Sequence, residues 1–122
     1  MVVDLSFKDK ETGEIYFIEI KSPKPNKDQT RQTKQKFSFL LATYENSKAY
    51  YALSYNPYGE RKENYKWEFT KMFFDLDKEV LIGREFWDFL GGEGTYDEIL
   101  QIFKKVGERK GKEITKRLIE RF

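Results

Sequence analysis

The first 21 residues constrain the fold most, because two stretches that alternate in polarity flank a single turn. Residues 2–8 and 15–21 are rich in β-branched and aromatic side chains, and residues 10–13 read Lys-Glu-Thr-Gly, a turn sequence. This pattern predicts an antiparallel β-hairpin. Its register places apolar side chains on one face, which must meet a core; the expected pairs are Val3 with Ile20, Leu5 with Ile18 and Phe7 with Tyr16.

The other face of the predicted hairpin carries two acidic residues and a lysine. The register puts Asp4 opposite Glu19, and Lys21 shares the face of Glu19 because residues i and i+2 of a strand point the same way. Two carboxylates so placed, with Cβ atoms roughly 4.5–5.5 Å apart, repel each other. A hard divalent cation between them would turn this repulsion into chelation, and the adjacent ammonium would stabilise charge on a phosphate. The pattern therefore favours metal-assisted phosphodiester hydrolysis.

A charged, solvated sheet face is the alternative interpretation, since antiparallel sheets commonly have one. Val2, Ile15 and Phe17 lie on the same face as Glu19, which argues against full exposure.

Two residue types are missing, and their absence excludes several kinds of site. The chain has no His and no Cys, so it contains no histidine-dependent nucleophile system, no disulfide and no Cys-ligated zinc or iron–sulfur site. Any metal must be held by oxygen ligands, which favours Mg²⁺, Mn²⁺ or Ca²⁺.

The rest of the chain predicts an α/β domain over residues 1–122. Asn26 and Gln29 resemble a capping box that opens a helix at residues 26–44. The first half of this helix, residues 27–36, has no apolar side chain and is expected to protrude into solvent or along a ligand, whereas the second half can be packed on all sides. Further elements are a strand at 49–55, a strand or irregular aromatic segment at 67–76, and helices at 84–90, 95–106 and 112–122.

Charge is segregated along the chain. Residues 21–36 and 104–121 are strongly basic, and residues 75–98 are strongly acidic. Two basic segments are compatible with a face that binds a polyanion, although solvated helix surface is the alternative.

A polar loop has side chains suited to a DNA groove, with an ordinary surface turn as the alternative; it contains Asn56, Tyr58, Arg61 and Lys62.

Apolar runs are too short for a membrane span of ~18 residues, and the N-terminus has no signal-peptide pattern, so a soluble, cytoplasmic protein is expected. Many Lys and Glu residues without Cys also suit a protein from a thermophile.

An aromatic cluster is expected to form core or a subunit interface; it comprises Trp67, Phe69, Phe73, Phe74, Phe86, Trp87 and Phe89.

The acidic residue and the Glu-X-Lys that follows it resemble the signature of PD-(D/E)XK nucleases. More narrowly, three segments resemble the TdeIII-type family of type II restriction endonucleases: residues 19–29 (Glu-Ile-Lys-Ser-Pro-Lys-Pro-Asn-Lys-Asp-Gln), 55–59 (Tyr-Asn-Pro-Tyr-Gly) and 83–89 (Gly-Arg-Glu-Phe-Trp-Asp-Phe). The resemblance covers residues 2–59 well and 80–107 more loosely.

The resemblance implies roles for matching positions. Asp4 and Glu19 would be metal ligands with the backbone carbonyl of Ile20, and Lys21 would position the attacking water. It also implies Mg²⁺, for which Mn²⁺ can substitute, double-stranded DNA as substrate and a homodimer. The residues expected to contact DNA are Lys24, Lys27, Gln29, Arg31, Lys34, Asn56 and Arg61.

The chain departs from this family in two ways. It begins almost on the strand of Asp4, so the helix and first strand that usually precede this position in the restriction-endonuclease-like core are missing, and Asp4 follows Val3 where the motif has proline. Three interpretations follow: a truncated piece of a longer chain, the C-terminal half of a split enzyme that needs an N-terminal segment or partner chain, or a natural short homologue. Two other functions stay open: a non-catalytic DNA-binding or assembly fragment, and a structure-specific repair or junction nuclease.

Overall fold

A four-stranded mixed sheet, in the order β1-β2-β3-β4, organises the first of two units into which the chain divides between Phe86 and Trp87. The computed structural model describes residues 2–121, with side chains as far as Ile119 in the last helix. The strands are β1 (Leu5–Lys8), β2 (Ile15–Lys21), β3 (Ser47–Leu53) and β4 (Val80–Ile82). The hairpin β1-β2 is antiparallel, whereas β3 runs parallel to both of its neighbours. The expected α/β class, with a hairpin, a helix and a further strand, is confirmed.

The hairpin has the predicted register, because Leu5 is paired with Ile18 and Phe7 with Tyr16. Its turn is fixed by Asp9, whose carboxylate accepts a hydrogen bond of 2.8 Å from the backbone N–H of Glu11. Gly13 closes the turn with a φ of +75°, a value that favours glycine.

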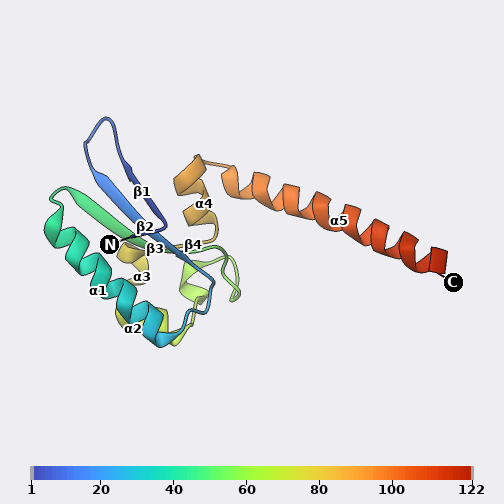
Figure 1. Ribbon diagram of the computed structural model, residues 1–122, viewed down its shortest axis with the longest axis horizontal. Helices are drawn as coiled ribbons and strands as arrows, with labels where there is room; N and C mark the ends of the chain where they lie inside the picture. Colours follow the sequence, from blue (N-terminus) through green and yellow to red (C-terminus); the bar gives the residue numbers. More distant parts are fainter. Residues whose placement is uncertain (1, 122) are drawn as a thin grey trace. The chain divides into compact units, whose positions relative to one another are not determined.

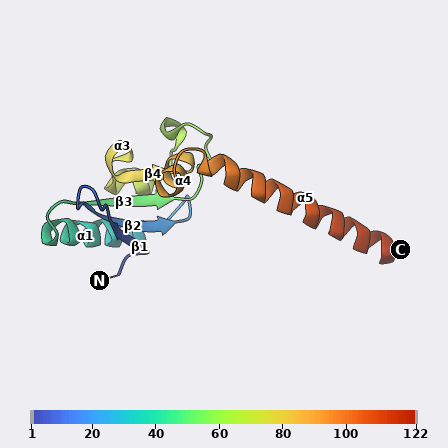
Figure 2. The same ribbon diagram turned by 90° about the horizontal axis from the view of Figure 1, so that it is seen from above.

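Helix α1 (Lys27–Thr43) packs along β2 and β3 (Figures 1 and 2) and begins at the predicted cap, where the Asn26 side chain accepts from the backbone N–H of Gln29 at 2.8 Å. The expectation that its first half protrudes is wrong, since Thr30 and Thr33 are buried. Thr30 Oγ1 donates to the carbonyl of Asn26 at 2.7 Å. A hydroxyl that bonds the preceding turn can be buried at little cost, so polar residues form a packed helix face here.

The second half of α1 is packed on one side only. Phe37 and Leu40 are buried, whereas Phe39 and Leu41 are exposed. The buried side chains join a core between α1 and the sheet; its members are Phe17, Phe37, Leu40, Ala49, Tyr51, Leu53, Tyr65, Phe74, Val80 and Ile82.

The opposite face of the hairpin meets a core only in part. Ile18 is fully buried, but Leu5, Phe7 and Ile20 are exposed. The expected apolar face is therefore present in the register, but its outer strand, β1, is exposed.

Residues 62–79 form helical turns where the aromatic pattern allowed a strand. They contain the 3-10 turn η1 (Lys62–Asn64), α2 (Glu68–Phe73) and α3 (Leu76–Glu79), so a strand at 67–76 is wrong. Two aromatic side chains of this segment hold the loop after β2. The Tyr65 hydroxyl donates to the carbonyl of Pro23 at 2.6 Å, and the Trp67 indole N–H donates to that of Pro25 at 2.7 Å.

The remaining helices are α4 (Arg84–Gly91), which was predicted, and α5 (Thr95–Arg121), which replaces two predicted helices. The expected break at residues 107–111 does not occur, because α5 continues through Gly107 and Gly111. Phe122, the last residue of the predicted final helix, lies outside the described residues. None of the helices in the described part of the chain has the length and apolar character needed to cross a bilayer.

The buried tyrosines predict how stability responds to alkaline pH. Burial raises the pKa of Tyr65 to about 12, and it also raises the pKa of Tyr51. A phenol of the unfolded chain ionises near pH 10. Tyr65 therefore contributes stability that is fully present below about pH 10 and is lost as pH rises toward its folded-state pKa of about 12, and Tyr51 contributes in the same direction. The free energy of unfolding, measured with urea at about pH 9, 10 and 11, should fall with pH. An equally steep fall in Tyr65→Phe would contradict the role of Tyr65.

Candidate metal centre

Asp4 lies just before β1, next to the C-terminal end of β2. Its Oδ2 accepts a hydrogen bond of 2.7 Å from the backbone N–H of Ile20. The ladder of β1 and β2 ends at the pair Leu5 and Ile18, so Asp4 and Glu19 form the next step of the register, beyond the last paired residues. This hydrogen bond holds the Asp4 carboxylate at the edge of β2, against the backbone of Ile20, which directly follows Glu19.

Glu19 points from β2 toward α1 and is buried, with 7% of its surface exposed. Its Oε2 accepts a hydrogen bond of 3.1 Å from Lys36 of α1, and its Oε1 lies 3.9 Å from Nζ of Lys21. A buried carboxylate needs such cationic partners, because its charge has lost most of its water. The interpretation of this face as an ordinary solvated surface is therefore wrong for Glu19.

Each of the two carboxylates has one oxygen held by a hydrogen-bond donor and a second that is less engaged. Among the described residues, Oδ1 of Asp4 accepts no hydrogen bond, and the 3.9 Å from Lys21 to Oε1 of Glu19 exceeds hydrogen-bond length. No group of three or more acidic residues that could hold a metal occurs in the described part of the chain. Two carboxylates with a nearby backbone carbonyl nevertheless fit Mg²⁺, which commonly takes one or two carboxylates and keeps its other positions for water and phosphate.

Lys36 is the member of this group that the sequence patterns missed. It lies three residues after Thr33 and four before Leu40, both of which are buried. This spacing places it on the packed face of α1. A lysine on a buried face requires an acceptor, and that requirement was the available signal.

The basic residues expected to contact DNA have different surroundings. The Lys24 ammonium lies 5.4 Å from the ring centroid of Tyr58 and 5.8 Å from that of Trp67, so two aromatic rings hold it. Arg31 pairs with Asp28 at 3.3 Å on the exposed side of α1. Lys27 is exposed at the start of α1, as is Gln29, one turn from the Asn26 cap.

The loop after β3 is held by its own side chains. Asn56 donates to the carbonyl of Arg61 at 3.0 Å and accepts from the backbone N–H of Tyr58 at 2.9 Å. Lys62 donates to the carbonyl of Val80 at 2.6 Å and pairs with Glu85 at 3.0 Å. Both polar atoms of the Asn56 amide therefore serve the turn, while Arg61 is exposed.

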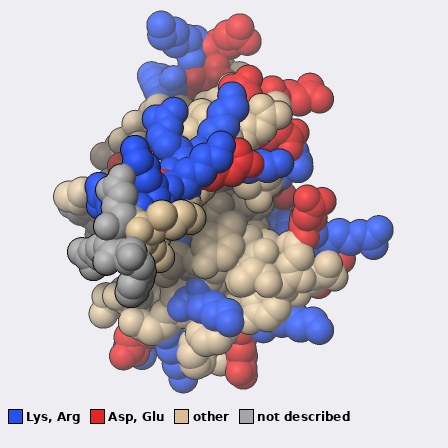
Figure 3. All heavy atoms as spheres, turned by 90° about the vertical axis from the view of Figure 1, so that its right-hand side faces the viewer, with Lys and Arg blue, Asp and Glu red and all other residues tan. Residues whose placement is uncertain are grey.

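Figure 3 shows Lys and Arg side chains interspersed with Asp and Glu side chains. The segregation of charge along the sequence thus does not give a purely basic surface on this face.

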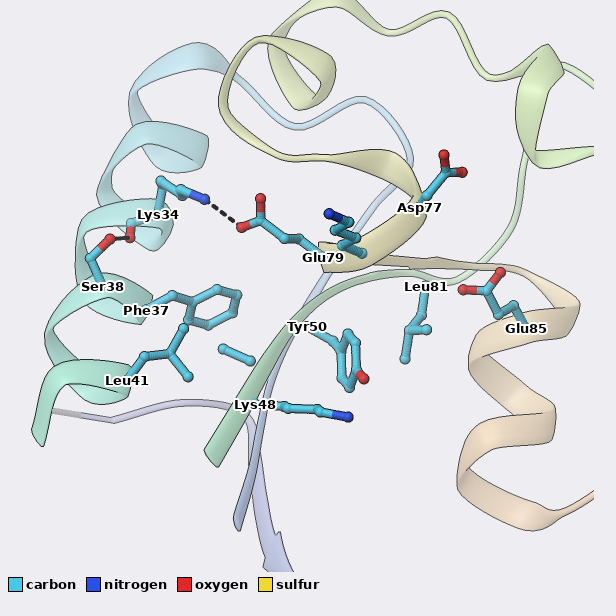
Figure 4. A pocket seen from close by; sticks show the side chains of 12 residues that line it. Lys34, Phe37, Ser38, Leu41, Lys48, Tyr50, Asp77, Glu79, Leu81 and Glu85 are labelled. Carbon is cyan, nitrogen blue, oxygen red and sulfur yellow. Dashed lines mark hydrogen bonds and ion pairs between the residues drawn. The ribbon is translucent and has the colours of Figure 1, made fainter. Parts of the chain in front are cut away.

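Lys34 faces a pocket rather than the carboxylates of β2. Figure 4 shows it pointing toward Glu79, with which it forms an ion pair. Its ammonium also lies 5.2 Å from the ring centroid of Phe74. The pocket, of about 590 Å³, is lined by residues of α1, β3, α3, β4 and the start of α4, and Asp4, Glu19 and Lys21 are not among them. The pocket and the candidate metal centre are therefore separate places in the first unit.

The sequence matches the family described as "Type II restriction endonuclease, HinfI" over residues 1–107. Among curated proteins it is similar to the type II restriction enzymes HgiCII and HgiEI of Herpetosiphon aurantiacus, with 41% and 40% identity over 88% of this chain and 41% of each relative. It is also similar to the type II restriction enzyme MjaII of Methanocaldococcus jannaschii, with 34% identity over 90% of this chain and 33% of that enzyme. The chain thus spans well under half the length of these relatives. The matches support the expected class, whereas they do not show the TdeIII-type resemblance.

Proposed function

Because the chain belongs to the HinfI family of type II restriction endonucleases, we propose that it carries the catalytic carboxylates of a Mg²⁺-dependent endonuclease that cleaves double-stranded DNA. The observation that carries this proposal is the pairing of Asp4 with the backbone of Ile20, directly beside the buried Glu19. The narrower TdeIII-type resemblance of residues 19–29, 55–59 and 83–89 stays a prediction.

Asp4, Glu19 and the carbonyl of Ile20 would hold the metal, with Mn²⁺ able to replace Mg²⁺. The N–H and C=O of one residue in an antiparallel pair point to the same neighbouring strand. The hydrogen bond from the N–H of Ile20 to Asp4 therefore supports a carbonyl directed to the same side. When bound, Mg²⁺ supplies a Lewis acid that offsets the negative charge of the scissile phosphate.

Lys21 would orient the attacking water and stabilise the charge that develops on the phosphate. Its position 3.9 Å from Oε1 of Glu19 supports this role, because the ammonium is near the carboxylate without a hydrogen bond that would fix it there. Lys24 and Lys27 would lie along the phosphate backbone of the DNA. The other proposed DNA contacts are Gln29, Arg31, Lys34, Asn56 and Arg61. Lys34 and Asn56 have the least support, because their polar atoms already serve Glu79 and the loop.

The test is cleavage of supercoiled plasmid by the purified chain with Mg²⁺, with EDTA as the control. Discrete linear fragments that disappear with EDTA are the expected result. Nicking or cutting only at branched DNA would favour the structure-specific nuclease instead. Binding without cleavage would contradict activity of this chain by itself and favour a non-catalytic fragment of a longer enzyme.

Replacing Lys27 by Ala should weaken DNA binding modestly and equally for all sequences. One lost phosphate contact lowers the steepness of the salt dependence of log K by about 1. Lys10→Ala is the matched control, since Lys10 is an exposed lysine in the hairpin turn. Fluorescence anisotropy with a labelled duplex at several salt concentrations measures both slopes. Identical slopes for Lys27→Ala and the parent chain would exclude Lys27 from the phosphate contacts.

A homodimer is part of the proposal, because cutting both strands of a symmetric site requires two active sites. Sedimentation velocity of the chain, alone and with duplex DNA, tests this directly. A chain that stays monomeric on DNA while it still cuts both strands would contradict the dimer.

A further inference from the structure

Lys36 connects three parts of the first unit through one ammonium group. It lies on α1, donates to Oε2 of Glu19 on β2 at 3.1 Å, and donates to the backbone carbonyl of Val2 at 2.8 Å. Its side chain is 23% exposed, and that of Glu19 is 9% exposed. Hydrogen bonds that involve a charged donor, made at a site partly screened from water, are the stronger class of hydrogen bond.

Apart from Lys36 and the hydrogen bond of Asp4, the described anchor of the segment that Lys36 holds is Val3, which is partly buried against the core. Strand β1 has only four residues, all of them exposed, and it lies at the edge of the sheet with β2 as its one neighbour. Val2 is itself 83% exposed. Asp4 lies between Val2 and β1, so it is held from one side by the N–H of Ile20 and from the other by the contact between Val2 and Lys36.

We propose that Lys36 is the positioning residue of the candidate metal centre: it fixes Oε2 of Glu19 and the Asp4-bearing segment in one arrangement, which leaves Oδ1 of Asp4 and Oε1 of Glu19 for a cation. This inference rests on the proposed nuclease function and deepens it. Lys36 does not contact the reacting phosphate in this assignment. Lys21 and Lys36 thus divide their roles, because Lys21 lies near Oε1, the oxygen left for the metal, and Lys36 binds Oε2.

The first test is independent of catalysis. Amide hydrogen exchange of the full chain, read by mass spectrometry, compares the parent with Lys36→Met. Residues 2–8 should exchange about tenfold faster in the variant, the change that corresponds to loss of one hydrogen bond with a charged donor, while β3 keeps its protection. Unchanged exchange at residues 2–8, or an equal increase throughout the first unit, would overturn the inference.

The second test uses DNA cleavage. Lys36→Met should lower kcat about tenfold or more with KM for DNA within about twofold, because the lysine acts on the geometry of the site and does not bind DNA. Lys36→Arg should recover most of the rate, since a guanidinium also reaches two acceptors. Lys48→Met is the matched control, because it removes a lysine paired with Glu14 at 3.4 Å.

The outcomes separate the inference from the function on which it rests. If the parent chain does not cleave DNA, the proposed activity of this chain fails, and the exchange experiment alone decides whether Lys36 anchors the Asp4 segment. If the parent cleaves and Lys36→Met matches it in kcat, the positioning role is wrong while the nuclease function stands. A loss of kcat equal to that of Lys48→Met would likewise overturn the inference.

Discussion

Replacing Asp4 by Asn should lower the rate of Mg²⁺-dependent DNA cleavage by at least about 100-fold while the fold stays intact. The amide oxygen of Asn can still accept the 2.7 Å hydrogen bond from the N–H of Ile20, so the local structure is preserved. The negative charge is lost, and with it half of the carboxylate charge that Asp4 and Glu19 offer a cation. Loss of about 3 kcal/mol of electrostatic stabilisation corresponds to about two orders of magnitude in rate.

Asp9→Asn is the matched control for this substitution. Asp9 lies on the same hairpin, and its carboxylate also accepts a backbone hydrogen bond, from Glu11 at 2.8 Å. The two variants therefore share the chemical change and differ only in place. Initial rates of plasmid cleavage and thermal unfolding should be measured for both. Activity of Asp4→Asn within about threefold of Asp9→Asn would remove Asp4 from the catalytic centre.

Local patterns were sufficient for the hairpin and for the start of α1. A period of two fixes which side chains share a strand face, and the turn fixes the register, so the pairing of Leu5 with Ile18 follows from the sequence. The Asn26 cap is likewise a contact over three residues. The same periodicity predicted that Asp4, Glu19 and Lys21 share a face, and the Asp4 carboxylate does lie against the backbone of Ile20, the residue between Glu19 and Lys21.

The parts that failed depend on contacts between distant residues. An aromatic segment at 67–76 has no periodicity that separates a strand from helical turns, and Tyr65 and Trp67 serve instead to hold the loop of Pro23 and Pro25. β4 has only three residues and is defined by its pairing with β3. Lys36 meets Glu19 only because α1 crosses β2, which no pattern within α1 specifies.

Replacing Phe74 by Ala should destabilise the first unit by about 3–5 kcal/mol, the usual cost of deleting a buried phenyl ring. Phe74 is 3% exposed, stacks on Tyr51 with ring centroids 4.5 Å apart, and meets the edge of Phe37 at 5.9 Å. Phe74, at the end of α2, thus contacts both α1 and β3. Its replacement by Ala leaves a cavity between these elements. Since domains are stable by roughly 5–15 kcal/mol, this change removes a large share of the total.

Phe39→Ala is the matched control, because Phe39 lies on α1 with 57% of its surface exposed. It should change stability by less than about 1 kcal/mol, since little apolar surface is lost and Ala favours the helix. Urea unfolding followed by circular dichroism measures both free energies. If the two substitutions cost the same, Phe74 does not join α1 to the sheet. Phe37 and Lys36 are neighbours on α1, and they contact Phe74 and Glu19 respectively. In that case, contacts other than the one between Phe37 and Phe74 would hold α1 against Glu19.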